Sequence, residues 1–260
     1  MIYEFTDTVS QPIMTDSRIK TVVNGINLDD IYSNKLMTLN VTGRAILPKR
    51  VRYTEKDYSD GAWHEGSSYP ARSISVEVKI KGDSNEEARE IYNNLNELIT
   101  QDELSIHFTD EPNMYFNVRL AGVTEPKEDQ NELIIELRFI ALDPFKYGSL
   151  TVLGKQVPSD YLYEITPNRI KMTLNTASQQ TKITNPRTGK NIVLEGSYVS
   201  GDILTFEWGD SPTIKRNGQV ILSDLNILSD FETFTVTGGD TLDVLPSTAT
   251  FEMTLRRKLI

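Results

Sequence analysis

Between Arg72 and Lys81, apolar and polar residues alternate without a break. The apolar positions are Ile74, Val76, Val78 and Ile80, and a serine, glutamate or lysine stands between each pair. Successive side chains of a β-strand point to opposite faces of its sheet. The pattern therefore predicts a strand with one buried and one solvated face.

A helix is predicted directly after this strand. Gly82 and Asp83 end the alternation, and Ser84 stands three residues before Glu87, which is the spacing of a helix capping box. The apolar residues that follow recur every three or four positions, as along one face of a helix. These residues are Ala88, Ile91, Leu95, Leu98 and Ile99. No other stretch of the chain predicts a helix convincingly.

Alternating runs resume after the helix and predict strands over 104–108, 115–121 and 132–142, separated by polar turns. A strand, a helix and then an antiparallel meander are typical of an α+β domain whose helix packs on a sheet. We therefore predict a first domain over residues 1–147, built from antiparallel sheets with one main helix.

The second half of the chain predicts only β-structure. Its clearest turn is Asn217-Gly218, a dipeptide typical of two-residue hairpins, between strand-like runs over 213–216 and 219–222. Many short strands separated by turns indicate a β-sandwich, here over residues 148–260. The other strand-like runs are 161–165, 169–174, 190–194, 203–208, 233–236, 241–245 and 249–256.

The stretch from Tyr53 to Tyr69 is rich in aromatic and acidic residues, but its apolar positions do not recur at the spacing of a strand or a helix. Long irregular stretches are uncommon in compact domains unless they are functional or disordered. Two hypotheses stay open: a mobile surface hairpin, and a segment ordered by a neighbouring subunit, because aromatic side chains tend to anchor interfaces. Under the second hypothesis the candidate partner-contact residues are Tyr58, Trp63 and Tyr69.

Charge and hydropathy narrow the classes of partner. The 260-residue chain has 27 basic and 37 acidic residues, a formal net charge of −10. This balance disfavours nucleic acid and anionic lipid, because both are bound by dense lysine and arginine. The mean hydropathy is −0.36, and the N-terminus lacks the basic start and apolar run of a signal peptide. We expect the protein to fold in the cytoplasm where it is made, with no membrane as partner.

Residues that would carry catalysis or hold a metal are scarce. The chain has no cysteine, and its two histidines, His64 and His107, have no acidic or histidine partner at metal-ligand spacing. Paired acids can hydrolyse glycosides, but the adjacent pairs here fall in turns or at element ends, and we interpret them as solvated. The pairs are Asp29-Asp30, Asp102-Glu103 and Glu128-Asp129. We predict no enzyme, no cofactor and no metal site.

Several short motifs follow one another in the order found in a known family. The chain resembles the distal tail proteins of siphophages over nearly its full length. It departs from them at Glu207-Trp208, where the family often has Asp, and at Gly238-Gly239-Asp240, which replaces a Pro-Gly-Asn-like turn. The matching motifs are Asn24-Gly25-Ile26, Arg72-Ser73-Ile74-Ser75-Val76, Leu104-Ser105-Ile106-His107-Phe108-Thr109-Asp110, Ala141-Leu142-Asp143-Pro144-Phe145, Ile183-Thr184-Asn185, Gly201-Asp202-Ile203-Leu204 and Asn217-Gly218.

The resemblance implies a structural hub at the tail tip of the virion. The N-terminal domain would form a homohexameric ring between the tail-tube protein and the tail-tip protein, with DNA passing through it. The C-terminal domain would be a galectin-like β-sandwich that carries receptor-binding or baseplate proteins. The last strand would return towards the N-terminal domain. Assembly would take place in the cytoplasm of the bacterial host.

The alternative is a carbohydrate-binding module used in host-surface adsorption, since galectin-like sandwiches can bind sugars. Galectin sites use a histidine, an asparagine, an arginine and a stacking tryptophan, and the second half of this chain has no histidine. Its one tryptophan, Trp208, alternates with Phe206, and we interpret both as core residues.

Overall fold

The computed structural model describes residues 19–260 except 33–34, 126–130 and 210. It divides into two compact units, one of residues 1–145 with Ile260 and the other of residues 146–259. The described chain is mostly antiparallel β-sheet with few helices. Strand β10 begins at Lys146, so the boundary expected after Tyr147 falls within this strand.

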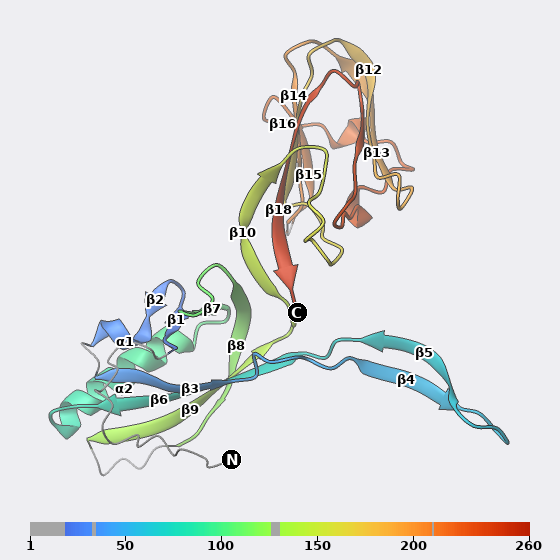
Figure 1. Ribbon diagram of the computed structural model, residues 1–260. Helices are drawn as coiled ribbons and strands as arrows, with labels where there is room; N and C mark the ends of the chain where they lie inside the picture. The colour runs from blue at the N-terminus through green and yellow to red at the C-terminus, as the bar shows by residue number, and fades with distance from the viewer. Residues whose placement is uncertain (1–18, 33–34, 126–130, 210) are drawn as a thin grey trace, which may run out of the picture. The chain divides into compact units, whose positions relative to one another are not determined.

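The first unit combines antiparallel strands with one long helix (Figure 1). Strands β3, β6, β9 and β8 pair in that order, and β8, β7, β1 and β2 continue the pairing. The strands are β1 (Thr21–Val23), β2 (Ile26–Asn27), β3 (Leu36–Thr42), β4 (Arg50–Glu55), β5 (Ala62–Ser68), β6 (Arg72–Lys81), β7 (Leu104–Phe108), β8 (Tyr115–Val123) and β9 (Glu132–Ala141), and the helices are α1 (Leu28–Ile31) and α2 (Asn85–Ile99).

The alternating run at 72–81 forms β6, and its apolar side chains are fully buried in the core of this unit. Helix α2 packs its apolar stripe on the same core, so both predictions are confirmed. Ser84 caps the helix by accepting a hydrogen bond from the Glu87 backbone N–H at 3.2 Å. The Glu87 carboxylate accepts one from the Asp83 N–H at 2.6 Å, which ties the turn after β6 to the start of the helix.

One of the acids expected in solvated turns is buried. Asp29 has no exposed surface, and its carboxylate accepts hydrogen bonds from the Thr38 backbone N–H at 3.1 Å and from the Thr38 hydroxyl at 2.8 Å. The prediction for Asp29 is wrong because the short helix α1, which the sequence did not predict, turns this side chain inward. Asp102 and Glu103 are exposed as expected, and the pair Glu128-Asp129 lies outside the described residues.

In the second unit two antiparallel sheets share one hydrophobic core. One sheet has the order β16-β15-β14-β11-β18-β10, and the other has the order β13-β12-β17. The strands are β10 (Lys146–Leu153), β11 (Arg169–Thr173), β12 (Ser178–Thr184), β13 (Asn191–Tyr198), β14 (Ile203–Glu207), β15 (Thr213–Arg216), β16 (Gln219–Val220), β17 (Asp243–Leu245) and β18 (Thr250–Leu259), with single 3-10 turns η2 (Leu222–Asp224) and η3 (Phe231–Thr233).

Two of the strands expected in this half do not form. The runs 161–165 and 233–236 are loops joined by one isolated bridge between Ile165 and Val236. Tyr161, Ile165, Phe234 and Val236 are nevertheless buried, so these runs contribute to the core from loops, whereas Leu162 is 70% exposed. The hairpin at Asn217-Gly218 is confirmed, with both residues at positive φ (49° and 86°) between β15 and β16.

Candidate assembly interface

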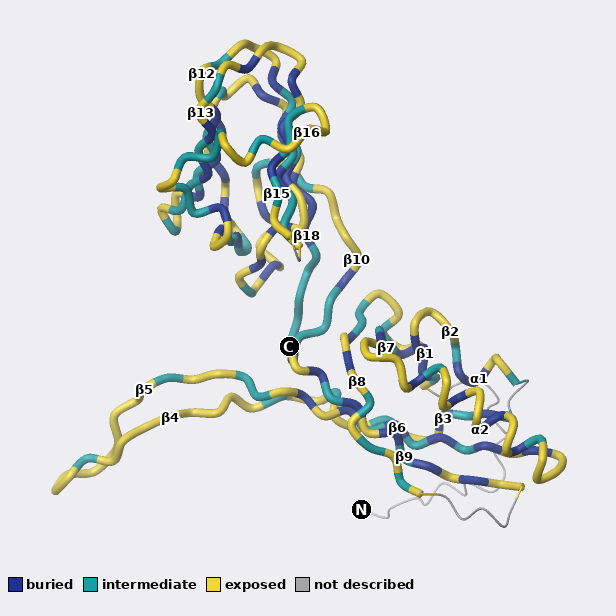
Figure 2. The backbone as a smooth tube through the Cα atoms, turned by 180° about the vertical axis from the view of Figure 1, so that it is seen from behind, coloured by how far each residue is buried: buried dark blue, intermediate teal, exposed yellow. Residues whose placement is uncertain are grey.

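The first unit contains an exposed ribbon formed by β4 and β5, and residues 50–68 are called the arm. The two strands pair from Arg50 opposite Ser68 to Glu55 opposite Ala62, and neither pairs with any other described strand. Every residue of β4 is exposed, and nearly the whole arm has the colour of exposed residues in Figure 2. The sequence predicted no strands here because a ribbon without a buried face has no apolar period.

Contacts within the arm are few and local. The Lys56 N–H donates to the Gly61 carbonyl at 3.2 Å and closes the turn, in which Tyr58 takes a positive φ of 59°. The Lys56 ammonium lies 4.6 Å from the centre of the Trp63 ring. Isolated two-stranded ribbons are marginally stable in water, so the arm depends on what surrounds it.

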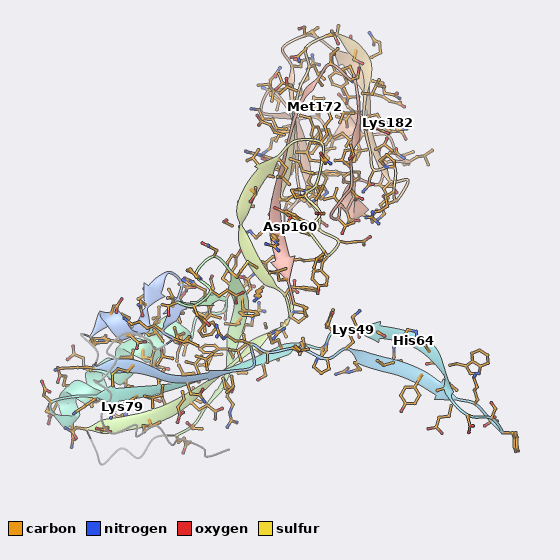
Figure 3. All side chains as sticks on the ribbon, viewed as in Figure 1. Lys49, His64, Lys79, Asp160, Met172 and Lys182 are labelled. Carbon is orange, nitrogen blue, oxygen red and sulfur yellow. The ribbon has the colours of Figure 1, made fainter. Side chains whose placement is uncertain are left out.

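The two faces of the arm differ in chemistry. Paired residues and alternate residues of a strand share a face, which places Arg50 and Arg52 on the side of the Trp63 ring, where Lys56 also lies. This side is called the basic face; it also holds Thr54, which pairs with Trp63, and the Glu65 carboxylate, which accepts a hydrogen bond from the Thr54 hydroxyl. Figure 3 shows the side chains along the arm, among them the labelled His64, projecting away from the ribbon. The residues of the opposite face are Val51, Tyr53, Glu55, Ala62, His64 and Ser67.

The chain segments that enter and leave the arm are held tightly by Arg72, the first residue of β6. Its side chain is buried and donates hydrogen bonds to the carbonyls of Gly43 and Ala45, both at 2.9 Å, and of Pro144 at 3.1 Å. The guanidinium also lies 5.5 Å from the centre of the Phe116 ring. Burial lowers the pKa of Arg72, and the three carbonyls take the place of a carboxylate partner.

Gly43 and Arg44 fix the same region to the sheet. Gly43 has a φ of 87°, and a Cβ at this position would lie 2.0 Å from the Ser73 carbonyl of β6, so only glycine fits. Arg44 forms a two-fold ion pair with Asp110, with both N–O distances at 2.7 Å. Residues 43–49 and 69–72, called the root of the arm, are therefore well anchored to the first unit, whereas β4 and β5 pair only with each other.

The structure separates the three residues predicted to contact a partner. Tyr58 lies at the tip of the arm and is fully exposed, and Trp63 lies on β5 with 65% of its surface exposed. Tyr69 lies at the root instead, edge-on to Phe145 with ring centres 5.9 Å apart, and Lys49 covers its ring. The sequence did not single out Arg50 and Arg52, whose alternation with Val51 and Tyr53 was the available signal.

Histidines and acids form no recognisable chemical site. His64 shares a hydrogen bond of 2.8 Å with Ser67 on the arm, and His107 lies half-buried in β7. Among the described residues no three His, Asp or Glu side chains gather as they would around a metal ion. Within that same part of the chain, no helix is long and apolar enough to cross a membrane.

In the second unit the tryptophan of the sugar-binding alternative is engaged with the core. Phe206 is buried, and Trp208 packs against Phe231 and Phe234, with ring centres 4.9 and 6.4 Å away. The Trp208 indole N–H donates to the Phe231 carbonyl at 2.7 Å. A ring held in this way is poorly suited to stack on a sugar.

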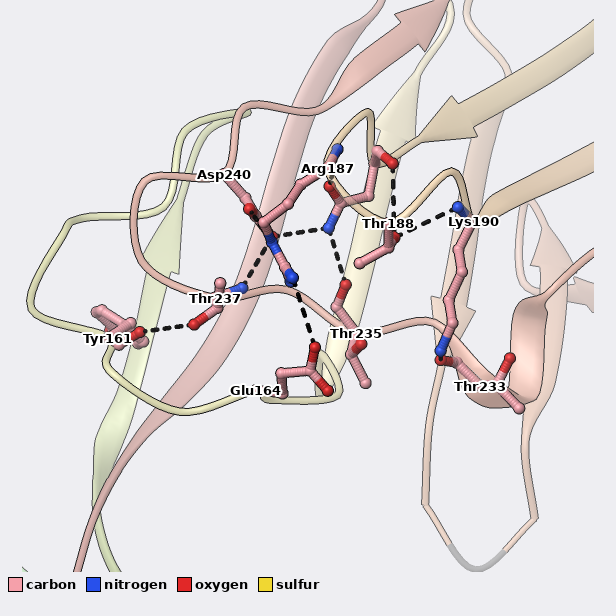
Figure 4. A network of polar contacts seen from close by, with 10 residues as sticks. Tyr161, Glu164, Arg187, Thr188, Lys190, Thr233, Thr235, Thr237 and Asp240 are labelled. Atoms are coloured by element: carbon pink, nitrogen blue, oxygen red, sulfur yellow. Dashed lines mark hydrogen bonds and ion pairs between the residues drawn. The ribbon is translucent and has the colours of Figure 1, made fainter. Parts of the chain in front are cut away.

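Polar side chains near the turn after β12 also bind one another (Figure 4). Asp240 accepts hydrogen bonds from the Asn185 amide and from the Arg187 Nε, both at 2.7 Å, and Arg187 also pairs with Glu164 at 3.5 Å. Burial alone would raise the pKa of Asp240, but these donors and the Thr237 N–H lower it overall. The network ties together loops of the second unit that are distant in the sequence.

A second exposed feature lies on the second unit. A hollow of about 610 Å³ is lined by Pro212, Leu222, residues 225–227 and residues 229–233. Beside it Ile227 and Leu228 are 95% and 83% exposed. The loop that carries them is braced against β13, since the Asn226 N–H donates to the Val193 carbonyl and the Asp230 N–H to the Asn191 carbonyl. Two aliphatic side chains are thus held in solvent by a well-bonded loop.

Two family models match the chain. The phage tail protein RIFT-related domain matches residues 29–140, and the C-terminal domain of the siphovirus-type tail component matches residues 163–257. The distal tail protein of Bacillus phage SPP1 is 27% identical over 226 residues, which are 83% of this chain and 87% of the relative.

Solved structures share the fold. The SPP1 Dit protein, described as a paradigm of hub adsorption apparatus in phages that infect Gram-positive bacteria, superposes with a TM-score of 0.75 at 20% identity. The match covers 94% of this chain and all of the other. A chain of the phage P2 baseplate in its activated conformation with calcium superposes with a TM-score of 0.55 at 10% identity, covering 93% of this chain and 99% of the other.

Proposed function

Because the chain belongs to the family of siphophage distal tail proteins, we propose that it is a structural hub of a phage tail tip. Six copies form a ring that joins the tail-tube protein to the tail-tip protein, and DNA passes through the ring. The ring assembles in the cytoplasm of the bacterial host and remains in the virion. The protein acts as a scaffold and not as an enzyme.

The arm is the observation that supports assembly through the first unit. A ribbon with both faces exposed buries too little to hold itself in water. Its root, by contrast, is fixed by Arg72 and by the ion pair of Arg44 with Asp110. A rigid root with an unsupported ribbon suits a segment that a neighbouring copy covers. Tyr58 and Trp63 are the aromatic anchors of this contact, and Tyr69 supports the root.

The second unit has a separate role in this proposal. It is a galectin-like sandwich that carries a receptor-binding or baseplate protein. The exposed pair Ile227 and Leu228 beside the hollow supports a protein partner, since large apolar side chains held in solvent mark interaction sites.

The test of the ring is the native mass of the purified protein, measured by multi-angle light scattering over a concentration series. We expect a species near six times 29.4 kDa, or two such rings stacked. The double variant Tyr58→Ala/Trp63→Ala is expected to shift the equilibrium towards monomer by at least tenfold. A strict monomer at every concentration would contradict a ring formed by the chain alone.

A matched control is available on the second unit. Ile227→Ala/Leu228→Ala also removes two exposed apolar side chains and is expected to leave the native mass unchanged. Equal loss of assembly in both double variants would show that the arm has no special part in it.

A further inference from the structure

The basic face of the arm holds three cations, Arg50, Arg52 and Lys56, against one acid, Glu65, so it is cationic on an acidic chain. Arg50 and Arg52 are exposed, and in the described part of the chain neither forms an ion pair. Lys56 and Trp63 continue the same face towards the tip, with the ammonium over the ring. The chain as a whole carries a net charge of −10, so such a face is complementary to most of the surface of another copy.

The outer row of helix α2 presents the opposite charge. Glu86, Glu90 and Glu97 recur at helical spacing on the side away from the buried stripe, and all three are exposed. Arg89 is also exposed on this side of the helix, and hydrogen bonds from the backbone of Glu86 and from Ser84 lower the pKa of the Glu86 carboxyl. Neighbouring carboxylates in such a row repel one another, which a cationic partner would relieve.

The spacings of the two charge rows agree. Arg50 and Arg52 are two residues apart on a strand, a distance of about 7 Å. Glu86 and Glu90 are four residues apart on a helix, a rise of about 6 Å. Two guanidinium groups on the arm can therefore face two carboxylates on α2 at the same time.

The two surfaces cannot meet within one chain. The arm ends just before Arg72, where β6 begins, and α2 starts just after Lys81, where β6 ends. A strand of ten residues spans about 33 Å and separates them. The basic face and the acidic row thus lie at opposite ends of one strand, which favours head-to-tail contacts between copies. Such contacts close into a ring when the rotation from one copy to the next allows it.

We propose that the basic face of the arm docks on the outer row of α2 in a second copy of this chain, with Arg50 and Arg52 facing Glu86 and Glu90. The inference rests on the proposed ring and names the contact that closes it. Trp63 lies over the helix at the centre of this contact, and Lys56 faces Glu97.

Reversed charges test the contact directly. Arg50→Glu/Arg52→Glu gives a chain with an acidic arm and an acidic helix, and Glu86→Lys/Glu90→Lys gives a chain with a basic arm and a basic helix. Each variant alone is expected to associate at least tenfold more weakly than wild type by light scattering. An equimolar mixture is expected to regain the wild-type mass, because every arm then meets a helix of opposite charge in an alternating ring.

The control for charge itself is Lys155→Glu/Arg169→Glu, two reversals of the same sign on the second unit, which is expected to assemble like wild type. Circular dichroism establishes that each variant is folded. Wild-type association by either reversed variant, or a mixture that stays dissociated, overturns the proposed contact while the ring of the wild type stands. A wild type that never associates overturns a ring formed by the chain alone, and the contact with it.

Discussion

Two hairpins of this molecule have similar local chemistry and opposite surroundings. The arm turns at Tyr58 with a positive φ, and the β15–β16 hairpin turns at Asn217-Gly218, also with positive φ. In β15 the side chain of Ile214 is fully buried against the core, whereas β4 exposes every residue. The second hairpin is therefore stabilised by burial, and the arm by its strand pairing, a few side-chain contacts and its root. Substitutions on the exposed strand β4 should therefore affect the fold far less than substitutions at the buried positions of β15.

The largest loss in the free energy of unfolding is expected from removing a buried side chain of the β15–β16 hairpin. Ile214→Ala should lower the free energy of unfolding by about 2–5 kcal/mol, because it leaves a cavity in the core. Urea unfolding followed by tryptophan fluorescence measures this, since Trp208 lies in the same unit. Val220→Ala on the exposed strand β16 is the control, and it should change the free energy of unfolding only slightly. An equal loss of stability in the two variants would contradict the burial of Ile214 in the core.

A substitution at the root of the arm should destabilise the protein nearly as much. Arg72→Met keeps an apolar stem but removes the donors to three carbonyls, and a loss of about 2–4 kcal/mol is expected from groups left without partners. Arg119→Met is the matched control, because Arg119 is exposed and pairs only on the surface with Glu103. Thermal unfolding by circular dichroism compares the two. A stable Arg72→Met variant would show that water replaces the guanidinium readily.

The turn of the second hairpin is tied to a buried acid, and this link should respond to pH. Burial raises the pKa of Asp202, but hydrogen bonds from the Val199 N–H, Arg216 and Asn217 lower it overall below its ordinary 3.8. A depressed folded-state pKa stabilises the protein above the unfolded value, and the contribution is lost as pH falls through the folded one. The wild type should therefore lose stability below about pH 4.

Asp202→Asn removes the ion pair with Arg216 and should cost about 1–3 kcal/mol at pH 7. Its unfolding midpoint should also fall less steeply than that of the wild type below pH 4, although Asp240 still contributes there. Urea midpoints between pH 2.5 and 7 measure both effects. Parallel curves for the two proteins would exclude Asp202 as a source of the acid sensitivity.

The smallest change in stability is expected from a substitution on the arm. Val51→Ala removes an exposed side chain from a ribbon without a core, and the free energy of unfolding should change by no more than about 0.5 kcal/mol. The same urea experiment measures it. A cost above that of Val220→Ala would mean that the arm packs on its own chain and is not a free ribbon.

Local patterns in the sequence account for the best-predicted elements. Strand β6 and helix α2 each bury one face. Their apolar residues therefore recur every two positions in β6 and every three or four in α2, and this repeat is visible in the sequence. The Asn217-Gly218 turn is equally local, because it requires two positive φ angles that these residues adopt easily. The shortage of chemical motifs and the order of short family motifs likewise come from the sequence alone.

Tertiary structure decided what no local pattern records. Residues 161–165 and 233–236 fill the core from loops, Asp29 is buried by a helix of four residues, and Arg72 joins three segments distant in the sequence. The arm is the clearest case: its strands exist although nothing in them is buried, since a period arises only where one face leaves water. The separation of its charged face from α2 is likewise set by β6, which runs between them.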